Sequence, residues 1–286
     1  MDSRCHFVSF GSGRRGYKLT LQRLRKEIER LDPKARVWLF DESKIAQEID
    51  GLDQSFSDFA RSNPRGFGFW VWKPWVVLEV MKKAQEGDIV FFLDAGCTVH
   101  TSPKSKLRYQ GYIRHIKEYG NLFFQLQFRE NNWTKREVVE HFQLEEQHKL
   151  SGQIFSGGHG HLVNASSHRI IEEWLEACTL DSGRLVRDVF STLHEDDRFI
   201  EHRHDQSVLS CLVKREGLTV VPDETFHHPR WNRDGDAFPF WATRKISGLP
   251  SWMGYYAPRA WPFVIKSRLT RKPLTKLVDP EYLAGL

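Results

Sequence analysis

Residues 66–97 combine an aromatic, glycine-spaced loop, a helix and a wholly apolar strand that runs into an acidic residue. The helix is predicted to begin at Trp72 and to end at Gly87. The run Ile89–Leu93 (IVFFL) is too apolar for a surface strand, and it leads directly to Asp94. Open α/β sheets bind a ligand or a metal ion at the carboxyl ends of their buried strands. This segment therefore predicts a functional site rather than a purely structural element.

The first hundred residues alternate between strand and helix. Strands are predicted at Cys5–Phe10, Arg36–Phe40 and Ile89–Leu93, and helices at Tyr17–Leu31, at about Lys44–Ala60 and from Trp72 onward. Such alternation is typical of a mostly parallel central sheet flanked by helices, so the predicted fold class is α/β. The glycines at residues 11–16 (GSGRRG) have the wrong spacing for a dinucleotide fingerprint, so a nicotinamide cofactor is not expected.

The second half of the chain is less regular. Strands are predicted within Gly120–Phe128, on both sides of a glycine turn in Gln153–Val163, and at Leu218–Val221; helices are predicted at Thr134–Leu150, Ser166–Thr179 and Asp205–Arg215. The sequence contains no internal repeat, low-complexity tract or linker. A single domain is therefore expected, and 286 residues with 40% hydrophobic content provide ample core for it.

Charge and cysteine content narrow the class of protein. The formal net charge of +5 favours an anionic ligand without naming one. No nucleic-acid recognition motif is present, so nucleic acid is not an expected partner. Four scattered cysteines without a CxxC pair indicate free thiols in a reducing compartment. The first residues lack a signal-peptide pattern, and no apolar run approaches the ~20 residues of a membrane span, so a cytoplasmic location is expected.

The C-terminal tail is basic. Between Trp261 and Leu277, lysine and arginine interleave with aromatic and aliphatic residues. Two alternatives follow: a terminal helix that packs on the domain, or a peripheral contact with an anionic membrane surface. Pro273 interrupts any long helix and weakens the membrane alternative, so the packed helix is slightly favoured.

Three motifs follow one another along the chain: WKP at residues 72–74, DAGC at 94–97 and HDQS at 204–207. In this order they resemble small GT-A-fold glycosyltransferases of bacterial and viral surface-polysaccharide pathways. The HDQS motif is similar to the Asp-Gln segment of the lipopolysaccharide galactosyltransferase and glycogenin-like enzymes. The resemblance spans about residues 5–244. It implies a hexosyltransferase that moves a sugar from a nucleotide-sugar donor to a glycan or lipid-linked saccharide acceptor.

The same resemblance implies a single GT-A-like (Rossmann-like) domain over residues 1–286. A nucleotide-sugar-binding half would cover about residues 1–115, an acceptor-side half about residues 116–245, and the basic tail residues 246–286. In the resembling fold the helix that starts at WKP faces the donor, and the strand that ends at DAGC carries the metal motif. The implied donor-binding residues are Trp72, Lys73, Asp94, Ala95 and Gly96.

Two of these residues also have ordinary structural explanations. An acid after a strand, such as Asp94, can simply cap the next turn. A lysine at a helix start, such as Lys73, can lie on the surface with its charge in water. A cation at that position can instead pair with the diphosphate or with a sugar carboxylate.

A divalent cation can neutralise the nucleoside diphosphate that leaves as the sugar bond breaks. Mn²⁺ and Mg²⁺ prefer oxygen ligands, so the carboxylate of Asp94 suits either ion. Gly96 stands where the resembling enzymes carry the second acid of Asp-x-Asp, which leaves the metal site incomplete. The resemblance implies a late histidine as a further ligand, and His227 and His228 are the candidates. The alternative is a reaction that needs no metal.

Asp205 and Gln206 open the predicted helix Asp205–Arg215, and the resemblance places the Asp-Gln pair beside the reacting sugar. Asp205 is the candidate base or hydroxyl partner. The alternative is an ordinary helix cap, because an acid at this position also stabilises a helix. Ser207 replaces the acid that follows in the resembling retaining enzymes, so neither a retaining nor an inverting outcome is implied.

Two functions from other classes stay open. One is a zinc metallohydrolase, although the histidine spacing differs from the usual zinc pattern. Its candidate ligands are His159, His161, His202, His204 and Asp205. The other is a noncatalytic carbohydrate-binding protein, because grouped aromatic rings suit stacking on sugar faces. Its candidate rings are Trp70, Trp72 and Trp75.

Overall fold

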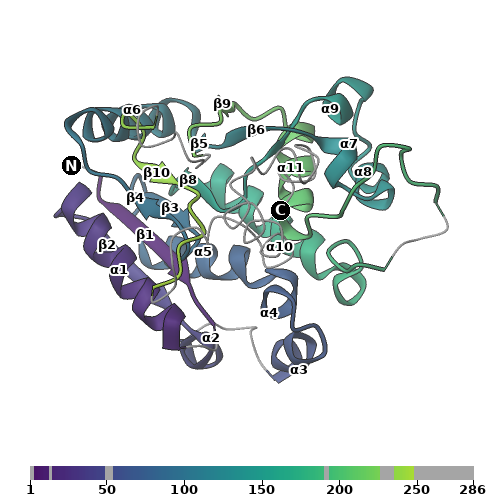
Figure 1. Cartoon of the computed structure of the whole chain (residues 1–286), viewed down its shortest axis with the longest axis horizontal. Helices are drawn as coiled ribbons and strands as arrows, with labels where there is room; N and C mark the ends of the chain where they lie inside the picture. The colour runs from purple at the N-terminus through teal and green to yellow at the C-terminus, as the bar shows by residue number, and fades with distance from the viewer. Residues whose placement is uncertain (1–2, 13–14, 49–53, 190–192, 226–234, 248–286) are drawn as a thin grey trace, which may run out of the picture.

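A five-stranded sheet forms the centre of the protein. The computed structural model describes residues 3–12, 15–48, 54–189, 193–225 and 235–247. The strands of the central sheet follow the order β2-β1-β3-β8-β5 (Figure 1). They are β1 Cys5–Phe10, β2 Arg36–Phe40, β3 Ile89–Leu93, β5 Asn121–Leu122 and β8 Gly158–Leu162. The N-terminal strands and the glycine-turn strand predicted from the sequence are therefore present.

The strand directions make the sheet mostly parallel. β1 pairs in parallel with both β2 and β3. β8 runs antiparallel to β3 and to β5, so four strands point the same way and β8 is reversed. The predicted α/β class, with a central sheet flanked by helices, is confirmed.

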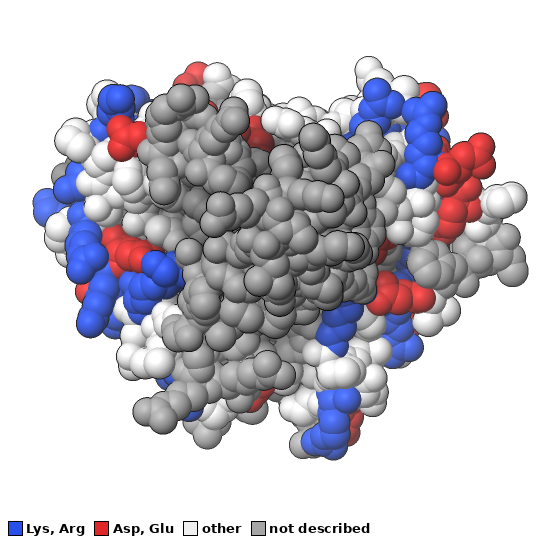
Figure 2. Space-filling view, viewed as in Figure 1, with Lys and Arg blue, Asp and Glu red and all other residues white. Residues whose placement is uncertain are grey.

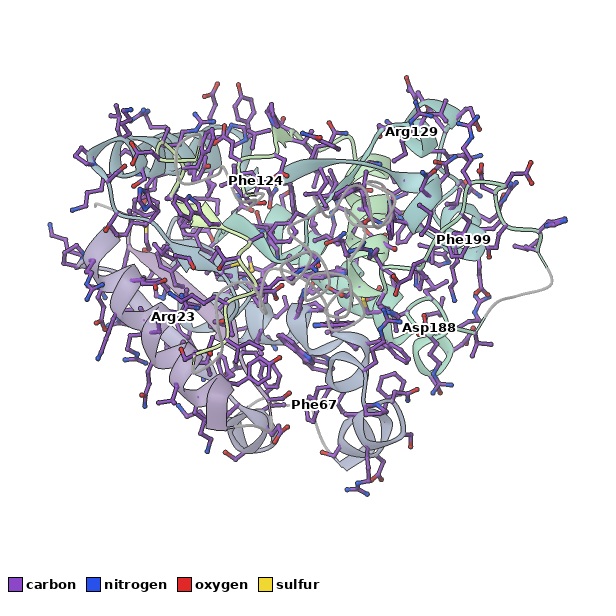
Figure 3. The ribbon with its side chains drawn as sticks, viewed as in Figure 1. Arg23, Phe67, Phe124, Arg129, Asp188 and Phe199 are labelled. Carbon is purple, nitrogen blue, oxygen red and sulfur yellow. The ribbon has the colours of Figure 1, made fainter. Side chains whose placement is uncertain are left out.

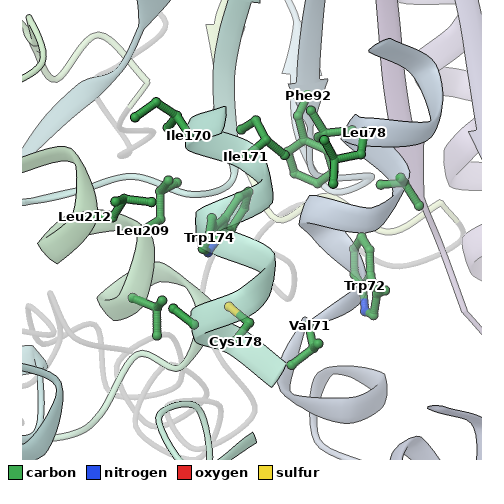
Figure 4. Close-up of a cluster of buried hydrophobic side chains, with 14 of the residues drawn as sticks. Val71, Trp72, Leu78, Phe92, Ile170, Ile171, Trp174, Cys178, Leu209 and Leu212 are labelled. Atoms are coloured by element: carbon green, nitrogen blue, oxygen red, sulfur yellow. The ribbon is translucent and has the colours of Figure 1, made fainter. Parts of the chain in front are cut away.

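Helices cover both faces of this sheet. On one face, helices α1 Arg15–Leu31 and α6 Pro103–Tyr119 pack against Phe7 and Phe91. On the other face, helices α5 Trp72–Lys83 and α10 Ala165–Gly183 pack against neighbouring strand residues such as Phe92 (Figure 4). Successive side chains of a strand point to opposite faces, which explains why a wholly apolar run such as β3 supplies both cores.

Two smaller sheets complete the described strands. β7 Gly152–Ile154, β6 Phe124–Arg129 and β9 Val221–Pro222 form one of them, in that order. The other pairs β4 Thr98–Val99 with β10 Phe240–Trp241 in antiparallel fashion. This second pairing brings the chain after residue 240 back to the turn that follows Asp94.

Several predicted elements are divided in the structure. The remaining helices are α2 Glu42–Glu48, α3 Gln54–Ser62, α4 Gly66–Phe69, α7 Glu130–Trp133, α8 Arg136–His141, α9 Glu146–Leu150 and α11 Asp205–Arg215. The single helix predicted at Thr134–Leu150 is wrong, because Gln143 has a φ of 50° and breaks it into α8 and α9. The strand predicted at Gly120–Phe128 is likewise divided into β5 and β6, which belong to different sheets. The strand predicted at Leu218–Val221 overlaps β9 only at Val221.

The described surface carries charges of both signs, and the cysteines agree with the sequence-based expectation. Lys and Arg are interspersed with Asp and Glu over the described part of the face in Figure 2. All four cysteines are free, as predicted, and all four are buried. Among the described residues, no helix has the length and apolar content to cross a membrane. The basic tail lies outside the described residues, so both of its alternatives stay predictions.

Candidate active site at the end of strand β3

A buried lysine joins two carboxylates from distant parts of the chain. The Nζ of Lys73 lies 3.3 Å from Oδ1 of Asp94 and 3.1 Å from Oδ2 of Asp205. Lys73 comes from the first turn of α5, Asp94 follows β3, and Asp205 opens α11 (Figure 1). The Lys73 side chain is only 4% exposed, so the alternative of a surface lysine is wrong. The structure thus brings together three of the residues that the sequence singled out.

Burial and charge act against each other in this cluster. Burial works to lower the pKa of Lys73, but the Asp205 and Asp94 carboxylates outweigh it and the pKa is raised. Burial also raises the pKa of Asp205 to about 6, although the Lys73 ammonium and a hydrogen bond from Ser156 oppose the rise. At neutral pH the lysine is therefore a fixed cation and Asp205 is largely ionised.

Hydrogen bonds hold Asp205 in place. The Ser156 hydroxyl donates to Oδ2 of Asp205 at 2.8 Å and accepts from Nζ of Lys73 at 3.1 Å. The indole N–H of Trp174 donates to the Asp205 carbonyl at 3.1 Å. The Asp205 side chain is 4% exposed, and its carboxylate lies against the Lys73 ammonium and the Ser156 hydroxyl. The predicted role of Asp205 as base or hydroxyl partner stays a prediction.

The start of α11 shows why Asp205 is not a simple helix cap. The N-cap residue is His204, with φ 50° and ψ −122° and no capping hydrogen bond from its side chain. A positive φ is uncommon in a residue other than glycine. The His204 ring stacks on Phe69 at 4.9 Å, and its Nδ1 donates to the Val186 carbonyl at 2.7 Å. These contacts fix the unusual backbone that turns the Asp205 carboxylate toward Lys73.

Gln206 lies beside the cluster and not within it. Its Oε1 accepts from the backbone N–H of Ser156 at 3.4 Å, and its Nε2 donates to Oε1 of Gln153 at 2.5 Å. Through Ser156, Gln206 therefore supports the segment that holds Asp205.

Asp94 is the most open member of the cluster. Its side chain is 38% exposed, and its carboxylate pairs with Lys73. The backbone N–H of Asp94 donates to the Gly157 carbonyl at 2.8 Å. A Cβ at Gly157 would lie 2.5 Å from Oδ2 of Asp94 and 2.4 Å from the Phe155 ring, so only glycine fits there. Because the carboxylate pairs with a lysine rather than with turn amides, the structure favours a site over a strand-end cap.

The turn after Asp94 is held from two sides. Arg23 of α1 (Figure 3) donates from Nη2 to the carbonyls of Ala95, at 2.9 Å, and Cys97, at 2.8 Å. On the other side, Lys245 N–H donates to the Gly96 carbonyl at 2.8 Å. A Cβ at Gly96 would lie 3.0 Å from Cα of Arg244. The backbone of Arg244 and Lys245 therefore fills the space next to Gly96, the position at which the resembling enzymes carry their second acid.

Trp72, a predicted donor contact, packs in the core, and its role in donor binding stays a prediction. The side chain is almost fully buried, and its ring centroid lies 4.1 Å from that of Phe10. Its indole N–H already donates to the Gly66 carbonyl at 2.9 Å. Trp70 and Trp75 are partly buried and pack against the same core. Among the described residues, the aromatic side chain that is exposed is Tyr119, the last residue of α6. A platform of aromatic rings that stack on a sugar, as in a noncatalytic carbohydrate-binding protein, is therefore not favoured.

The described residues do not fit a divalent cation. Within the described ranges, no group of three His, Cys, Asp or Glu side chains could hold a metal ion. The accessible carboxylate, Asp94, lies 3.3 Å from an ammonium that would repel a dication. His227 and His228 lie outside the described residues, so their predicted role as ligands stays a prediction.

The histidines of the zinc alternative are engaged within the protein. Nε2 of His202 lies 2.9 Å from the Leu185 carbonyl. Nδ1 of His159 lies 2.7 Å from Nε2 of His161, and both rings are fully buried. Burial lowers the pKa of His159 well below its usual range. A zinc metallohydrolase is therefore not favoured.

The sequence did not reveal three contributors to this site: Ser156, Gly157 as a neighbour of Asp94, and Arg244 over Gly96. The glycine pair after Ser156 was visible, but the acid it accommodates lies about sixty residues earlier in the chain. Only the pairing of β3 with β8 and of β4 with β10 brings these residues to Asp94.

Comparisons with known proteins found similar solved structures but no matching protein family. No protein-family model and no curated protein matches this chain. Among solved structures, the galactosyltransferase LgtC in complex with donor and acceptor sugar analogues is similar, with 12% identity, a TM-score of 0.48, and coverage of 98% of this chain and 100% of that chain. A glycosyltransferase involved in glycosylation of the major capsid of PBCV-1 has 11% identity, a TM-score of 0.45, and coverage of 87% and 95%.

A third similar structure is core-mannan synthase A from Aspergillus fumigatus in an Mn/GDP form. It has 9% identity, a TM-score of 0.41, and coverage of 78% of this chain and 73% of that chain. The first two of these similar structures are a galactosyltransferase and a glycosyltransferase. Their TM-scores lie below 0.5, so the chemistry of this chain has to be argued from its own residues.

Proposed function

We propose that this protein is a glycosyltransferase that moves a hexosyl group from a nucleoside diphosphate sugar to a saccharide acceptor, either a glycan or a lipid-linked saccharide. The observation that carries the proposal is the cluster of Lys73, Asp94 and Asp205 at the carboxyl end of β3. Parallel sheets bind substrates at this edge. The motifs that supply these three residues are those that resemble GT-A glycosyltransferases.

Each member of the cluster has its own part in the transfer. Asp94, the most exposed, accepts hydrogen bonds from hydroxyls of the donor sugar. Lys73 provides a fixed positive charge behind it, and Asp205 orients Lys73. Charges that are held in place before the reaction stabilise a developing charge without reorganisation. Gln206 supports this arrangement through Ser156.

The reaction exchanges one bond for another. The bond between the anomeric carbon and the diphosphate oxygen breaks, and its electron pair goes to the leaving nucleoside diphosphate. The acceptor hydroxyl oxygen forms the new bond to the anomeric carbon, and its proton is released to the leaving phosphate or to solvent. Cationic groups at the site neutralise the diphosphate.

The setting of the reaction is also a proposal. Four buried free thiols suit a reducing compartment such as the cytoplasm. The resemblance of the motifs favours an acceptor in surface-polysaccharide synthesis.

The test is a screen of the purified full-length chain against UDP-, GDP- and dTDP-sugars, with mono- and disaccharide acceptors. Release of nucleoside diphosphate and sugar transfer are both followed. We expect turnover with at least one donor, and its loss in Asp94→Asn. The matched control is Asp58→Asn, which removes a carboxylate from an exposed ion pair on α3. Normal turnover in Asp94→Asn, or no binding of any nucleotide sugar by the wild type, would overturn the proposal.

A further inference from the structure

The aromatic turn that leads into α5 is left-handed. Residues 66–70 (GFGFW) all have positive φ values, between 53° and 81°. A left-handed turn costs free energy in every residue that has a Cβ atom, and this one contains three aromatic residues. The first position requires glycine, because a Cβ at Gly66 would lie 2.3 Å from the Trp70 ring. The alternation of glycine and aromatic residues before WKP therefore has a conformational cause.

Hydrogen bonds join this turn to the helix that carries Lys73. The backbone N–H of Phe69 donates to the Arg65 carbonyl at 2.8 Å, and that of Trp70 donates to the Gly66 carbonyl at 3.2 Å. The backbone N–H of Lys73 then donates to the Trp70 carbonyl at 3.0 Å. The chain thus passes from a left-handed turn directly into the first turn of α5. Because the two are continuous, the position of the turn sets the position of Lys73.

A second strained residue precedes the other member of the ion pair. His204 comes directly before Asp205, and its φ of 50° lies in the region that favours glycine. The His204 ring stacks on Phe69, with centroids 4.9 Å apart and an angle of 25° between the ring planes. Its centroid also lies 5.4 Å from that of Trp70. The two strained segments, one before Lys73 and one before Asp205, therefore pack directly on each other.

Ion pairs reinforce the same contact. Arg65, the residue before the left-handed turn, pairs with Asp188 at 3.1 Å and also with Glu201. Glu201 belongs to the segment that leads into His204. These charged groups are partly exposed, so their pairing adds orientation more than stability. The rings of His204 and Phe69 are almost fully enclosed, and their stacking is the main contact between the two segments.

We infer that the left-handed turn at residues 66–70 and the His204 ring form one positioning element, which holds the Lys73 ammonium against the Asp205 carboxylate. The inference rests on the proposed function only for its effect on catalysis. Strained backbone persists where the surrounding contacts over-determine it, and here it lies shortly before each of the two charges. Phe69 and His204 act through the ion pair, so both are positioning residues. Loss of their stacking should separate the ammonium from the carboxylate.

Substitutions at His204 test the backbone strain. We would compare urea unfolding of His204→Gly and His204→Ala in the full-length protein. Both variants lack the ring, but glycine adopts a positive φ freely, so we expect His204→Gly to be the more stable of the two. At an unstrained position the order is reversed, because glycine loses more conformational freedom on folding. An alanine variant as stable as the glycine variant would contradict the strain.

The Lys73 ammonium gives a readout that needs no turnover. Lys73 and Lys214 are both enclosed and hydrogen-bonded, so their ammonium protons should exchange slowly with water and give signals in proton–nitrogen NMR spectra. We expect faster exchange to remove the Lys73 signal in His204→Gly. The Lys214 signal is the internal control and should be unchanged, because its ammonium pairs with Glu130 at 2.6 Å, away from the stacked rings.

A variant on the other side of the contact keeps the test independent of His204. Phe69→Leu removes the stacked ring but keeps an apolar side chain, so the fold should be retained. We expect it to lose the Lys73 signal as His204→Gly does. His204→Phe keeps a ring on Phe69 and should retain the signal. The matched control is His115→Ala, which removes an imidazole that packs on Tyr119 at 4.7 Å on α6 and should change neither lysine signal.

Activity supplies the second readout once a donor is identified. We expect kcat to fall about 10²-fold in His204→Gly and in Phe69→Leu with a small change in KM, as for a catalytic group that is misplaced by a distant change. His115→Ala should turn over as the wild type does. Selective loss of the Lys73 signal together with the fall in kcat supports the inference.

Other outcomes overturn it, and they separate it from the proposed function. A Lys73 signal that persists in both His204→Gly and Phe69→Leu would show that the turn does not hold the ammonium. Loss of the Lys73 and Lys214 signals together would indicate a general loosening of the fold, and unchanged kcat would leave the element without a part in the reaction. Selective loss of the Lys73 signal in a protein that turns over no donor would support the positioning element and contradict the proposed glycosyltransferase.

Discussion

The Lys73 ammonium lies 3.1 Å from the Asp205 carboxylate, and both side chains are almost fully enclosed by protein. Lys73 comes from the first turn of α5, and Asp205 from the first turn of α11. An enclosed ion pair of this kind is weak support for stability, because desolvation of both charges offsets their attraction. An enclosed ion pair next to the more open carboxylate of Asp94 instead suits a functional arrangement of charge.

Asp205→Asn should separate function from stability. The asparagine keeps the shape of the side chain but removes the charge that orients Lys73, so we expect kcat to fall about 10²-fold with a small change in KM. Burial disfavours the charged form of Asp205, but Asn also leaves the enclosed Lys73 ammonium with one carboxylate fewer. These two effects oppose each other, so the free energy of unfolding at pH 7 should change little. Steady-state kinetics and urea unfolding measure the two effects.

A purely structural role would give the reverse pattern. Lower stability with unchanged kcat in Asp205→Asn would contradict the positioning role. Asp58→Asn is the control for loss of a surface carboxylate. It breaks an exposed ion pair, and such a pair contributes about 0–1 kcal/mol to stability.

The ionisation of Asp205 should also make the stability of the protein depend on pH. Asp205 has a pKa of about 6 in the folded protein, against about 3.9 in an unfolded chain. Between these values the folded state binds more protons at this carboxyl, so its contribution to stability falls as pH rises from about 4 to 6. The wild type should lose up to about 3 kcal/mol relative to Asp205→Asn across this window.

Unfolding curves for both proteins between pH 4 and pH 7 provide the measurement. Buried histidines such as His159 have lowered pKa values and titrate with the opposite sign, but they are present in both proteins and cancel in the difference. Activity of the wild type should rise through about pH 6 as Asp205 ionises. A constant difference in unfolding free energy across the window would argue against the raised pKa.

Gly157→Ala should damage the site through Asp94. The added methyl group would lie 2.5 Å from Oδ2 of Asp94 and 2.4 Å from the Phe155 ring, so both must move. We expect kcat/KM to fall about 10²-fold, and stability to fall by about 1–3 kcal/mol. The control is Gly111→Ala in α6, where the nearest atom would lie 3.7 Å away. That change should be neutral or stabilising by up to about 1 kcal/mol. Similar kinetics in the two variants would refute the contact with Asp94.

Gly96→Asp should not repair a metal site. It restores the Asp-x-Asp pattern, but the new side chain would meet the Arg244 backbone at 3.0 Å. We expect lower activity and a loss of about 1–3 kcal/mol in stability from overpacking. Activity measured with and without Mn²⁺ is the readout. A variant that gains activity only with Mn²⁺ would show that the backbone yields and that the place of the second acid is usable.

Local sequence patterns were enough to predict the helices and strands that are determined by their own residues. The apolar run of β3, the helix α11 and the alternation of strand and helix were all predicted, because side-chain periodicity and turn residues report on their own neighbourhood. The end of an apolar strand singled out Asp94, and the resemblance of the WKP and HDQS motifs to GT-A glycosyltransferases singled out Lys73 and Asp205. Side-chain periodicity could not separate a core tryptophan from a sugar-binding one, because an aromatic ring suits either environment, and only the structure shows that Trp72 packs in the core.

The sequence by itself determined the α/β class and the candidate charges, since both are written in short stretches of chain. Only the tertiary structure decided that Lys73 lies between two carboxylates, that Ser156 holds Asp205, and that Arg244 closes the space at Gly96. These contacts join residues about 20 to 150 positions apart. They follow from strand pairing and core packing, whose energies depend on the whole fold. The sequence pattern of any one segment therefore does not reveal them.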